Sequence, residues 1–341
     1  MTFLGSALAA VLASALLLLL GRESPELALA GWLIGFVFTA AIAIGSLVLV
    51  LIHALTGGRW LDGLRAPLGR AVASVPGLLI VFVPIGLYLK FLYPWNHPGA
   101  DVSPDVARYY LNNFSFLLRS AVALVGWSLL ALVVPALRGR QRLVAAAVGL
   151  VFHVLAVSLV SVDWVLSLDP GFTSTDFAAG IAIAQLVAAL AWGALLAPAS
   201  SGGRQTTDIA GLMLATLLGV IYLVFMQYVV DWYGDLPKDV AWYDSRVSGI
   251  WRWLTLAALV GGGLIPALAL MFASVRSSAR ALRWVALAVL PGIFLHVVWL
   301  VGPQFGVASL PAGALATIAI GGILIALSSG PLLAWKPLHG F

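Results

Sequence analysis

LAGWLIGFVFTAAIAIGSLVLVLIHAL, residues 29–55, contains no Asp, Glu, Lys or Arg, so every face of a helix built from it is apolar. About 20 such residues form a helix that crosses the roughly 30 Å hydrocarbon layer of a membrane. Similar runs lie near residues 3–20, 29–55, 72–93, 114–137, 143–167, 177–197, 208–232, 250–275, 282–302 and 310–335. The sequence therefore predicts an all-α polytopic membrane protein with about ten transmembrane helices in a single integral membrane domain, residues 1–341.

The composition supports the same class. Of 341 residues, 62% are hydrophobic and 9% are charged, and the mean hydropathy is +1.07, whereas a soluble domain carries about 25% charged residues. The absence of cysteine excludes thiolate metal sites, iron–sulfur ligation and covalently attached haem. A redox cofactor held by this chain alone would be a quinone such as menaquinone, a flavin or a His-ligated haem. We expect no metal site and no nucleic-acid partner.

The cations predict the orientation in the lipid bilayer. Alternate loops carry three arginines each: Arg59, Arg65 and Arg70, then Arg138, Arg140 and Arg142, then Arg276, Arg280 and Arg283. The same side holds Arg204 and Lys336, whereas the opposite loops hold Arg22, Arg108, Lys238 and Arg246 among acidic residues. Cytoplasmic loops are enriched in Lys and Arg. The pattern predicts a bacterial inner-membrane protein with both termini in the cytoplasm.

The spans can be grouped into two bundles of four helices, residues 29–167 and 177–302, flanked by the first and last helices. A shift of four helices preserves the direction across the membrane, so the two groups could be a parallel repeat. The second helix of each group ends in aromatic residues, at Tyr93 and Trp95 in one group and at Trp232 and Tyr233 in the other. Aromatic helix ends are common, so the likeness is weak.

Buried polar residues form a tier in the periplasmic half of the predicted bundles. They are Arg119, Asp163, Gln185, Gln227 and Asp231. A charge inside a membrane costs about 2.5 to 3.5 kcal/mol on insertion scales, so each needs a partner or a function. One hypothesis is a lock, in which Arg119 pairs with Asp163 or Asp231 and the glutamines bond neighbouring helices. The other is a proton relay or a quinone headgroup site, for which Asp163 is the best candidate.

Three histidines are further candidates for a proton path or a quinone site. His53 lies near the cytoplasmic end of its helix, His153 lies near mid-membrane, and His296 lies slightly closer to the periplasm. A bis-His haem requires two histidines at matched depth, whereas His153 and His296 differ by roughly 6 Å. Interior hydrogen-bonded histidines are therefore favoured over a haem. In the eighth span, glycines 261–263 indicate close helix packing or a kink.

The outward loops carry turn-forming, aromatic and acidic residues. We predict that they dock partner subunits through Tyr93, Trp95, His97, Trp232, Tyr233 and Asp235. Asp169, in the sequence Ser-Leu-Asp-Pro, joins Asp163 and Asp231 as a candidate carrier of protons. The alternative for each single aromatic residue is the belt of Trp and Tyr that lines membrane interfaces.

Several segments resemble the F subunit of bacterial alternative complex III. In the family's order they are 51–60 (LIHALTGGRW), 92–95 (LYPW), 110–112 (YLN) followed by Arg119, 161–170 (SVDWVLSLDP), and 227–237 from Gln-Tyr to Trp-Tyr-Gly-Asp-Leu-Pro. They span residues 51–237, and 161–170 is the most specific. That family is similar to the quinol-interacting membrane subunits of polysulfide and nitrite reductases, which have two four-helix bundles with flanking helices.

The resemblance implies a subunit of a respiratory quinol:electron acceptor oxidoreductase, and one that is not catalytic alone. Its implied partners are periplasmic iron–sulfur and multihaem cytochrome c subunits and a homologous membrane subunit of the nitrite-reductase type, the C subunit, which holds the main quinol pocket. The implied role is to support quinol oxidation and proton conduction near the periplasm without a cofactor of its own. Two departures are residues 171–176, where the family carries a His-Trp type segment, and Val near His296, where it carries an acidic residue.

Two alternatives remain beside this hypothesis. A purely structural anchor of such a complex would need the same polar tier as a lock. A secondary transporter is suggested by the possible repeat and the buried charges, and it would act without partner subunits.

Overall fold

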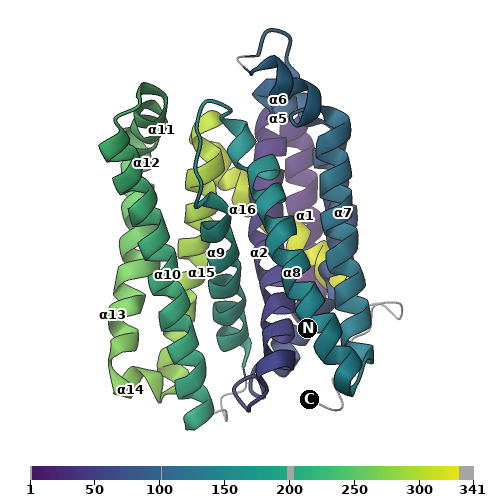
Figure 1. Ribbon diagram of the computed structural model, residues 1–341, viewed down its shortest axis with the longest axis vertical. Helices are drawn as coiled ribbons and strands as arrows, with labels where there is room; N and C mark the ends of the chain where they lie inside the picture. The colour runs from purple at the N-terminus through teal and green to yellow at the C-terminus, as the bar shows by residue number, and fades with distance from the viewer. Residues whose placement is uncertain (1, 101, 198–202, 330–341) are drawn as a thin grey trace.

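The computed structural model describes residues 2–100, 102–197 and 203–329 (Figure 1), and all regular structure in these ranges is helical. The helices are α1 (Thr2–Glu23), α2 (Pro25–Thr56), α3 (Arg65–Ala73), α4 (Leu78–Leu87), α5 (Leu89–Leu92), α6 (Pro104–Tyr109), α7 (Asn113–Val133), α8 (Gly139–Trp164), α9 (Phe177–Leu196), α10 (Arg204–Gly234), α11 (Pro237–Val247), α12 (Gly249–Leu256), α13 (Ile265–Met271), α14 (Ala273–Arg276), α15 (Ala279–Val301) and α16 (Ser309–Ser329). A π-helix, η5 (Ala257–Leu264), joins α12 to α13, and short 3₁₀ turns are η1 (Val75–Gly77), η2 (Pro94–Asn96), η3 (Val134–Ala136), η4 (Leu166–Leu168) and η6 (Gly302–Gln304).

Within the described ranges, nine helical stretches are long and apolar enough to cross a membrane. They are Pro25–Thr56, Arg65–Leu87, Asn113–Ala136, Gly139–Leu168, Phe177–Leu196, Arg204–Gly234, Gly249–Met271, Ala279–Gln304 and Ser309–Ser328. The prediction of an all-α polytopic membrane protein is therefore confirmed. The first predicted span forms α1, which is not among the nine. The last predicted span forms α16, while residues 330–335 and Lys336 lie outside the described residues.

The third span differs from its predicted bounds of 72–93. It begins at Arg65, whose guanidinium is 2.6 Å from the Asp62 carboxylate in the preceding turn. The helix ends at Leu87 because Tyr88 leaves the helical conformation, with φ −121° and ψ 34°. The span also tightens to a 3₁₀ turn around Pro76, which has no backbone N–H to continue the α-helical ladder. The predicted bounds were wrong because they followed the apolar run alone. The helix in fact includes charged residues at its start and a proline inside it.

Helix α2 is the centre of the molecule and makes extensive contacts with α16, α9, α8 and α3. It is apolar on all sides, and such a helix is stable only where neighbours cover it completely. Small residues let those neighbours approach closely. A Cβ added at Gly45 would lie 2.0 Å from the carbonyl oxygen of Gln185 on α9, and one added at Gly35 would lie 2.8 Å from the backbone of α16. The contacts between α2, α9 and α16 are therefore contacts of backbones, typical of membrane helices.

The remaining spans pack in two groups around this centre. Helices α2, α4, α7 and α8 contact one another, and we call them the first bundle. Helices α9, α10 and α15 contact one another, and α10 and α15 also contact the α12–η5–α13 span. We call these the second bundle. The groups meet where α9 contacts α2 and α8, and α16 packs beside α2 with α1. A relation by descent between the two bundles stays a prediction.

The two ends of the molecule differ in charge. The short helices α5, α6 and α11 lie at one end, the α11 end, and α14 lies at the other, the α14 end (Figure 1). Because the spans alternate in direction, the arginine-rich loops fall at the α14 end. Its described cations are Arg59, Arg65, Arg70, Arg138, Arg140, Arg142, Arg204, Arg276, Arg280 and Arg283, and its described acids are Asp62 and Asp208. The other acids in the described ranges belong to the α11 half.

Candidate functional site

The buried ion pair of the first bundle joins Arg119 on α7 to Asp163 on α8. Arg119 donates from Nε at 2.7 Å and from Nη2 at 2.8 Å to the two carboxylate oxygens, and Nη2 also donates to the carbonyl of Tyr110 at 2.9 Å. The Asp163 side chain is fully buried and that of Arg119 is 15% exposed. This bidentate geometry is the strongest arrangement for an Arg–carboxylate pair. Of the two acids considered as partners of Arg119, the structure selects Asp163.

Tyr110 completes the surroundings of this pair. The Arg119 guanidinium lies over the Tyr110 ring, 3.8 Å from its centroid. Burial, together with the negative charge of Asp163, raises the pKa of Tyr110 to about 12. The phenol therefore stays neutral at physiological pH, and the guanidinium is held between a carboxylate and an aromatic face.

Further hydrogen bonds tie the α5–α6 segment to the end of α8. Ser167 donates to the Asp163 carbonyl at 2.6 Å, and Trp95 donates to the Ser167 hydroxyl at 3.1 Å. Tyr93 donates to the carbonyl of Trp164 at 3.1 Å. Tyr93 and Trp95, which we predicted to dock partners, are both buried and use their polar atoms inside the chain. The predicted docking residues that are exposed are His97, Trp232, Tyr233 and Asp235.

The second bundle brings a different set of polar residues together at the same end. One small cavity of about 20 Å³ is lined by Asp176 before α9, Gln227 on α10, Tyr243 on α11 and His296 on α15. Burial, and after it the charge of Asp231, raises the pKa of Tyr243 well above its ordinary value, so its hydroxyl remains a donor. The predicted residues Gln227, Asp231 and His296 thus belong to one neighbourhood.

These groups are far less saturated than the pair in the first bundle. Within the described part of the chain, the side chains of Gln227 and His296 have no hydrogen-bond partner, and one oxygen of Asp231 is buried without one. His296 stacks on Trp299, with ring centroids 5.7 Å apart and planes at 20°. Unsatisfied polar groups around a cavity can bind water or a ligand, and the buried oxygen of Asp231 gains most from such a partner because an unpaired buried acceptor is costly.

Helix α11 supplies residues that the sequence did not single out as a site. Trp242 stacks on Phe172 at 4.1 Å between ring centroids, and the Arg246 guanidinium lies 3.7 Å from the centroid of a Trp242 ring. Arg246 is 1% exposed and donates to the carbonyls of Trp242 and Leu300. Burial lowers the pKa of Arg246 to about 10, against the opposing charge of Asp169, so it remains charged. Trp242 and Arg246 are four apart on one helix face, a signal that could have indicated this buried stack.

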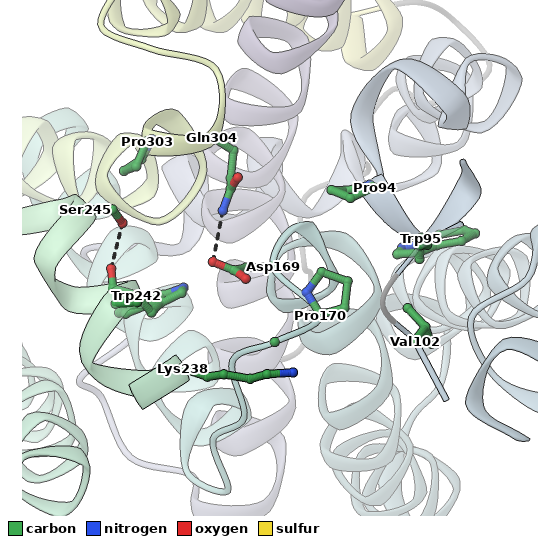
Figure 2. Close-up of a pocket in the computed structure, with 13 residues that line it drawn as sticks. Pro94, Trp95, Val102, Asp169, Pro170, Lys238, Trp242, Ser245, Pro303 and Gln304 are labelled. Atoms are coloured by element: carbon green, nitrogen blue, oxygen red, sulfur yellow. Dashed lines mark hydrogen bonds between the residues drawn. The ribbon is translucent and has the colours of Figure 1, made fainter. Parts of the chain in front are cut away.

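A wider pocket opens at the α11 end between the two bundles (Figure 2). It has a volume of about 450 Å³ and is lined by the η2 segment around Trp95, by Asp169 and Pro170, by α11 and by η6. The Gln304 amide donates to the Asp169 carboxylate across it at 3.0 Å, and the Lys238 side chain extends along one wall. The volume of this pocket is in the range of small-molecule sites. Its lining by proline and tryptophan could equally bind a loop of another protein, because aromatic residues are enriched at protein–protein interfaces.

The other predicted site residues are dispersed. Gln185 is buried on α9 where α9 meets α2, and its Oε1 has no partner among the described residues. His53 lies edge-on to Trp60 at 5.2 Å near the α14 end, and His153 lies 6.0 Å from Trp127 in the first bundle. In the described ranges, no group of three His, Cys, Asp or Glu residues could hold a metal ion.

No family model matches this chain, and no curated protein matches it.

Proposed function

We propose that this chain is a membrane subunit of a bacterial respiratory complex that oxidises quinol and passes the electrons to a cytochrome c-type acceptor. The observation that carries the proposal is the gathering of buried and half-buried polar groups from both bundles at the α11 end, beside a pocket formed by both. Released protons need acceptors at the side where they leave, and carboxylates such as Asp231 and Asp169 lie there. The resemblance of residues 51–237 to the F subunit of alternative complex III supports the same function.

The charge difference between the two ends supports the orientation within this proposal. The α14 end, with ten described arginines and two described acids, faces the cytoplasm of the inner membrane, together with both termini. The α11 end faces the periplasm. There the pocket between the bundles receives periplasmic iron–sulfur and multihaem cytochrome c subunits, and a homologous membrane subunit of the nitrite-reductase type packs beside the chain.

The first experiment is purification of the tagged chain from its native membrane in mild detergent, with mass spectrometry of co-purifying proteins and extraction of bound quinone. We expect iron–sulfur and multihaem cytochrome subunits to co-purify. A solitary chain would contradict the proposal and would favour a transporter.

Two variants of α11 locate the docking face. Ala241 lines the pocket between the bundles, whereas the exposed neighbour Val240 does not. We expect Ala241→Trp to release the extrinsic subunits because the indole occupies the pocket, and Val240→Trp to retain them. Equal retention by both variants would show that the subunits dock elsewhere.

A second candidate, a purely structural anchor of the same complex, is favoured by the saturation of the Arg119–Asp163 pair. Both carboxylate oxygens of Asp163 accept from Arg119, and Nη2 of Arg119 also donates to the Tyr110 carbonyl, which suits a lock better than a relay. Turnover of the assembled complex separates the two candidates. An anchor tolerates Asp231→Asn without loss of turnover, whereas a proton acceptor at this position does not.

A further inference from the structure

The second bundle contains a groove that neither the polar tier nor the pocket between the bundles explains. It has a volume of about 80 Å³ and lies between α10, the π-helix η5 and α15. Its walls are mainly apolar, with Val220, Ile221 and Val224 from α10. The polar lining groups are Thr255, which already donates to the carbonyls of Arg246 and Trp251, and the rings of His296 and Trp299. The same two residues line the small polar cavity that also contains Gln227 and Tyr243. The groove and the polar cavity are therefore neighbours that share one wall.

The π-helix gives the groove its shape. Gly262 of η5 packs on Gly292 of α15 so closely that an added Cβ would lie 2.3 Å from the Gly292 Cα. This contact fixes η5 against α15, and Gly263 beside it lines the groove. A Cβ at Gly263 would meet Ile221 at an ordinary 3.6 Å, so space remains at this position. π-Helical segments are rare and are often found at functional sites.

The end of the groove offers hydrogen bonds but disfavours anions. Both ring nitrogens of His296 lack a partner in the described chain, and the residue lines both cavities. Asp176 lines the adjoining cavity, and Asp231 interacts with Tyr243 beside it. These carboxylates repel a fatty acid or a phospholipid phosphate. A neutral headgroup is the chemistry that fits.

The stacked rings of His296 and Trp299 also favour a ligand of a particular shape. A flat aromatic wall favours a planar ring by stacking. The groove has about half the volume of the roughly 150 Å³ cavity that encloses benzene, so it covers one edge of a ring and leaves the rest to lipid. Leu259 lines the groove and is 37% exposed within the candidate membrane span Gly249–Met271, so a tail can continue from here into the bilayer.

We infer that this groove binds a neutral, planar, membrane-soluble ring with a hydrogen-bonding edge at His296 and an apolar tail between α10 and η5. The identification of the ligand as a quinol rests on the proposed function, whereas the location in the second bundle rests on the groove itself. Gln227 and Tyr243 line the adjoining cavity, so they can form water-mediated hydrogen bonds with the edge of the ring.

The test is photolabelling of the purified full chain with a short-tailed azidoquinone, followed by mass spectrometry of the labelled peptides. We expect label on the segments 217–224, 255–263 and 292–299. Label confined to the first bundle would overturn the location. Absence of saturable label would overturn the binding site even if the extrinsic subunits co-purify, so this failure is separate from that of the proposed function.

Matched variants separate the groove from general effects on folding. Gly263→Val fills the groove and should abolish the label, whereas Gly261→Val, whose Cβ meets nothing within 4 Å, should retain it. His296→Leu should weaken binding about fivefold through the lost hydrogen bond, whereas His153→Leu in the first bundle should not. Equal labelling of the Gly263 and Gly261 variants would contradict the inference. So would unchanged binding by the His296 variant.

Discussion

The α11 ends of the two bundles hold similar polar residues in opposite states. In the first bundle, Arg119 and Asp163 satisfy each other in a bidentate pair, and Tyr110 covers the guanidinium. In the second bundle, Gln227 and His296 face small cavities without partners in the described chain. A polar residue in the interior of a membrane protein is therefore a poor guide to function until its partners are known. Saturated groups stabilise the fold, whereas unsatisfied groups can bind.

The largest effect is expected at the saturated pair. Asp163→Asn leaves a buried guanidinium without its counter-charge, and breaking such a pair costs about 3 to 5 kcal/mol. The free energy of unfolding, measured by SDS titration of the purified chain, should fall by this amount. The double variant Arg119→Met/Asp163→Leu removes both charges and should recover most of the stability. An Asp163→Asn chain as stable as the wild type would show that the pair is not a lock.

A smaller effect is expected at the backbone contact behind the groove of the second bundle. Gly262→Ala places a methyl group against Gly292, and overpacking of this kind costs about 1 to 3 kcal/mol. The control is Gly261→Ala, whose added methyl group meets nothing within 4 Å. It should leave the free energy of unfolding unchanged or slightly higher. The measurement is the same SDS titration. Equal stability of the two variants would mean that η5 and α15 can separate, so that the groove has no fixed wall.

The sequence predicted the spans well where length and apolar composition were sufficient. Residues 25–56 are an example, because any uncharged run of this length must cross the membrane or be buried. The third span was misplaced because its start at Arg65 depends on a local ion pair and its end on the conformation of Tyr88. The π-helix could be anticipated only as an irregularity at three glycines, since its geometry depends on the contact of Gly262 with Gly292, which is distant in sequence.

The candidate site was predicted only in part. The positions of Arg119 and Asp163 along their predicted helices put both side chains between one and two turns from the same end of the bundle, and the two form an ion pair in the structure. It could not separate Asp163 from Asp231 as the partner, since rotation about the helix axis is set by packing. The residues 237–247 were treated as a loop, so the buried stack of Trp242 and Arg246 and the role of Tyr243 were missed.

The smallest effect is expected from the same substitution in the second bundle. Asp231→Asn removes a charge that forms no ion pair within the described residues and that lies near Asp176 and Asp239, which repel it. We expect the free energy of unfolding to change by less than about 1 kcal/mol, with stabilisation as the favoured sign. Asp163→Asn, which is the same chemical change in the first bundle, is the control. A loss of stability at Asp231 as large as that at Asp163 would mean that the second bundle is locked in the same way, and the contrast between a saturated and an open bundle would then fail.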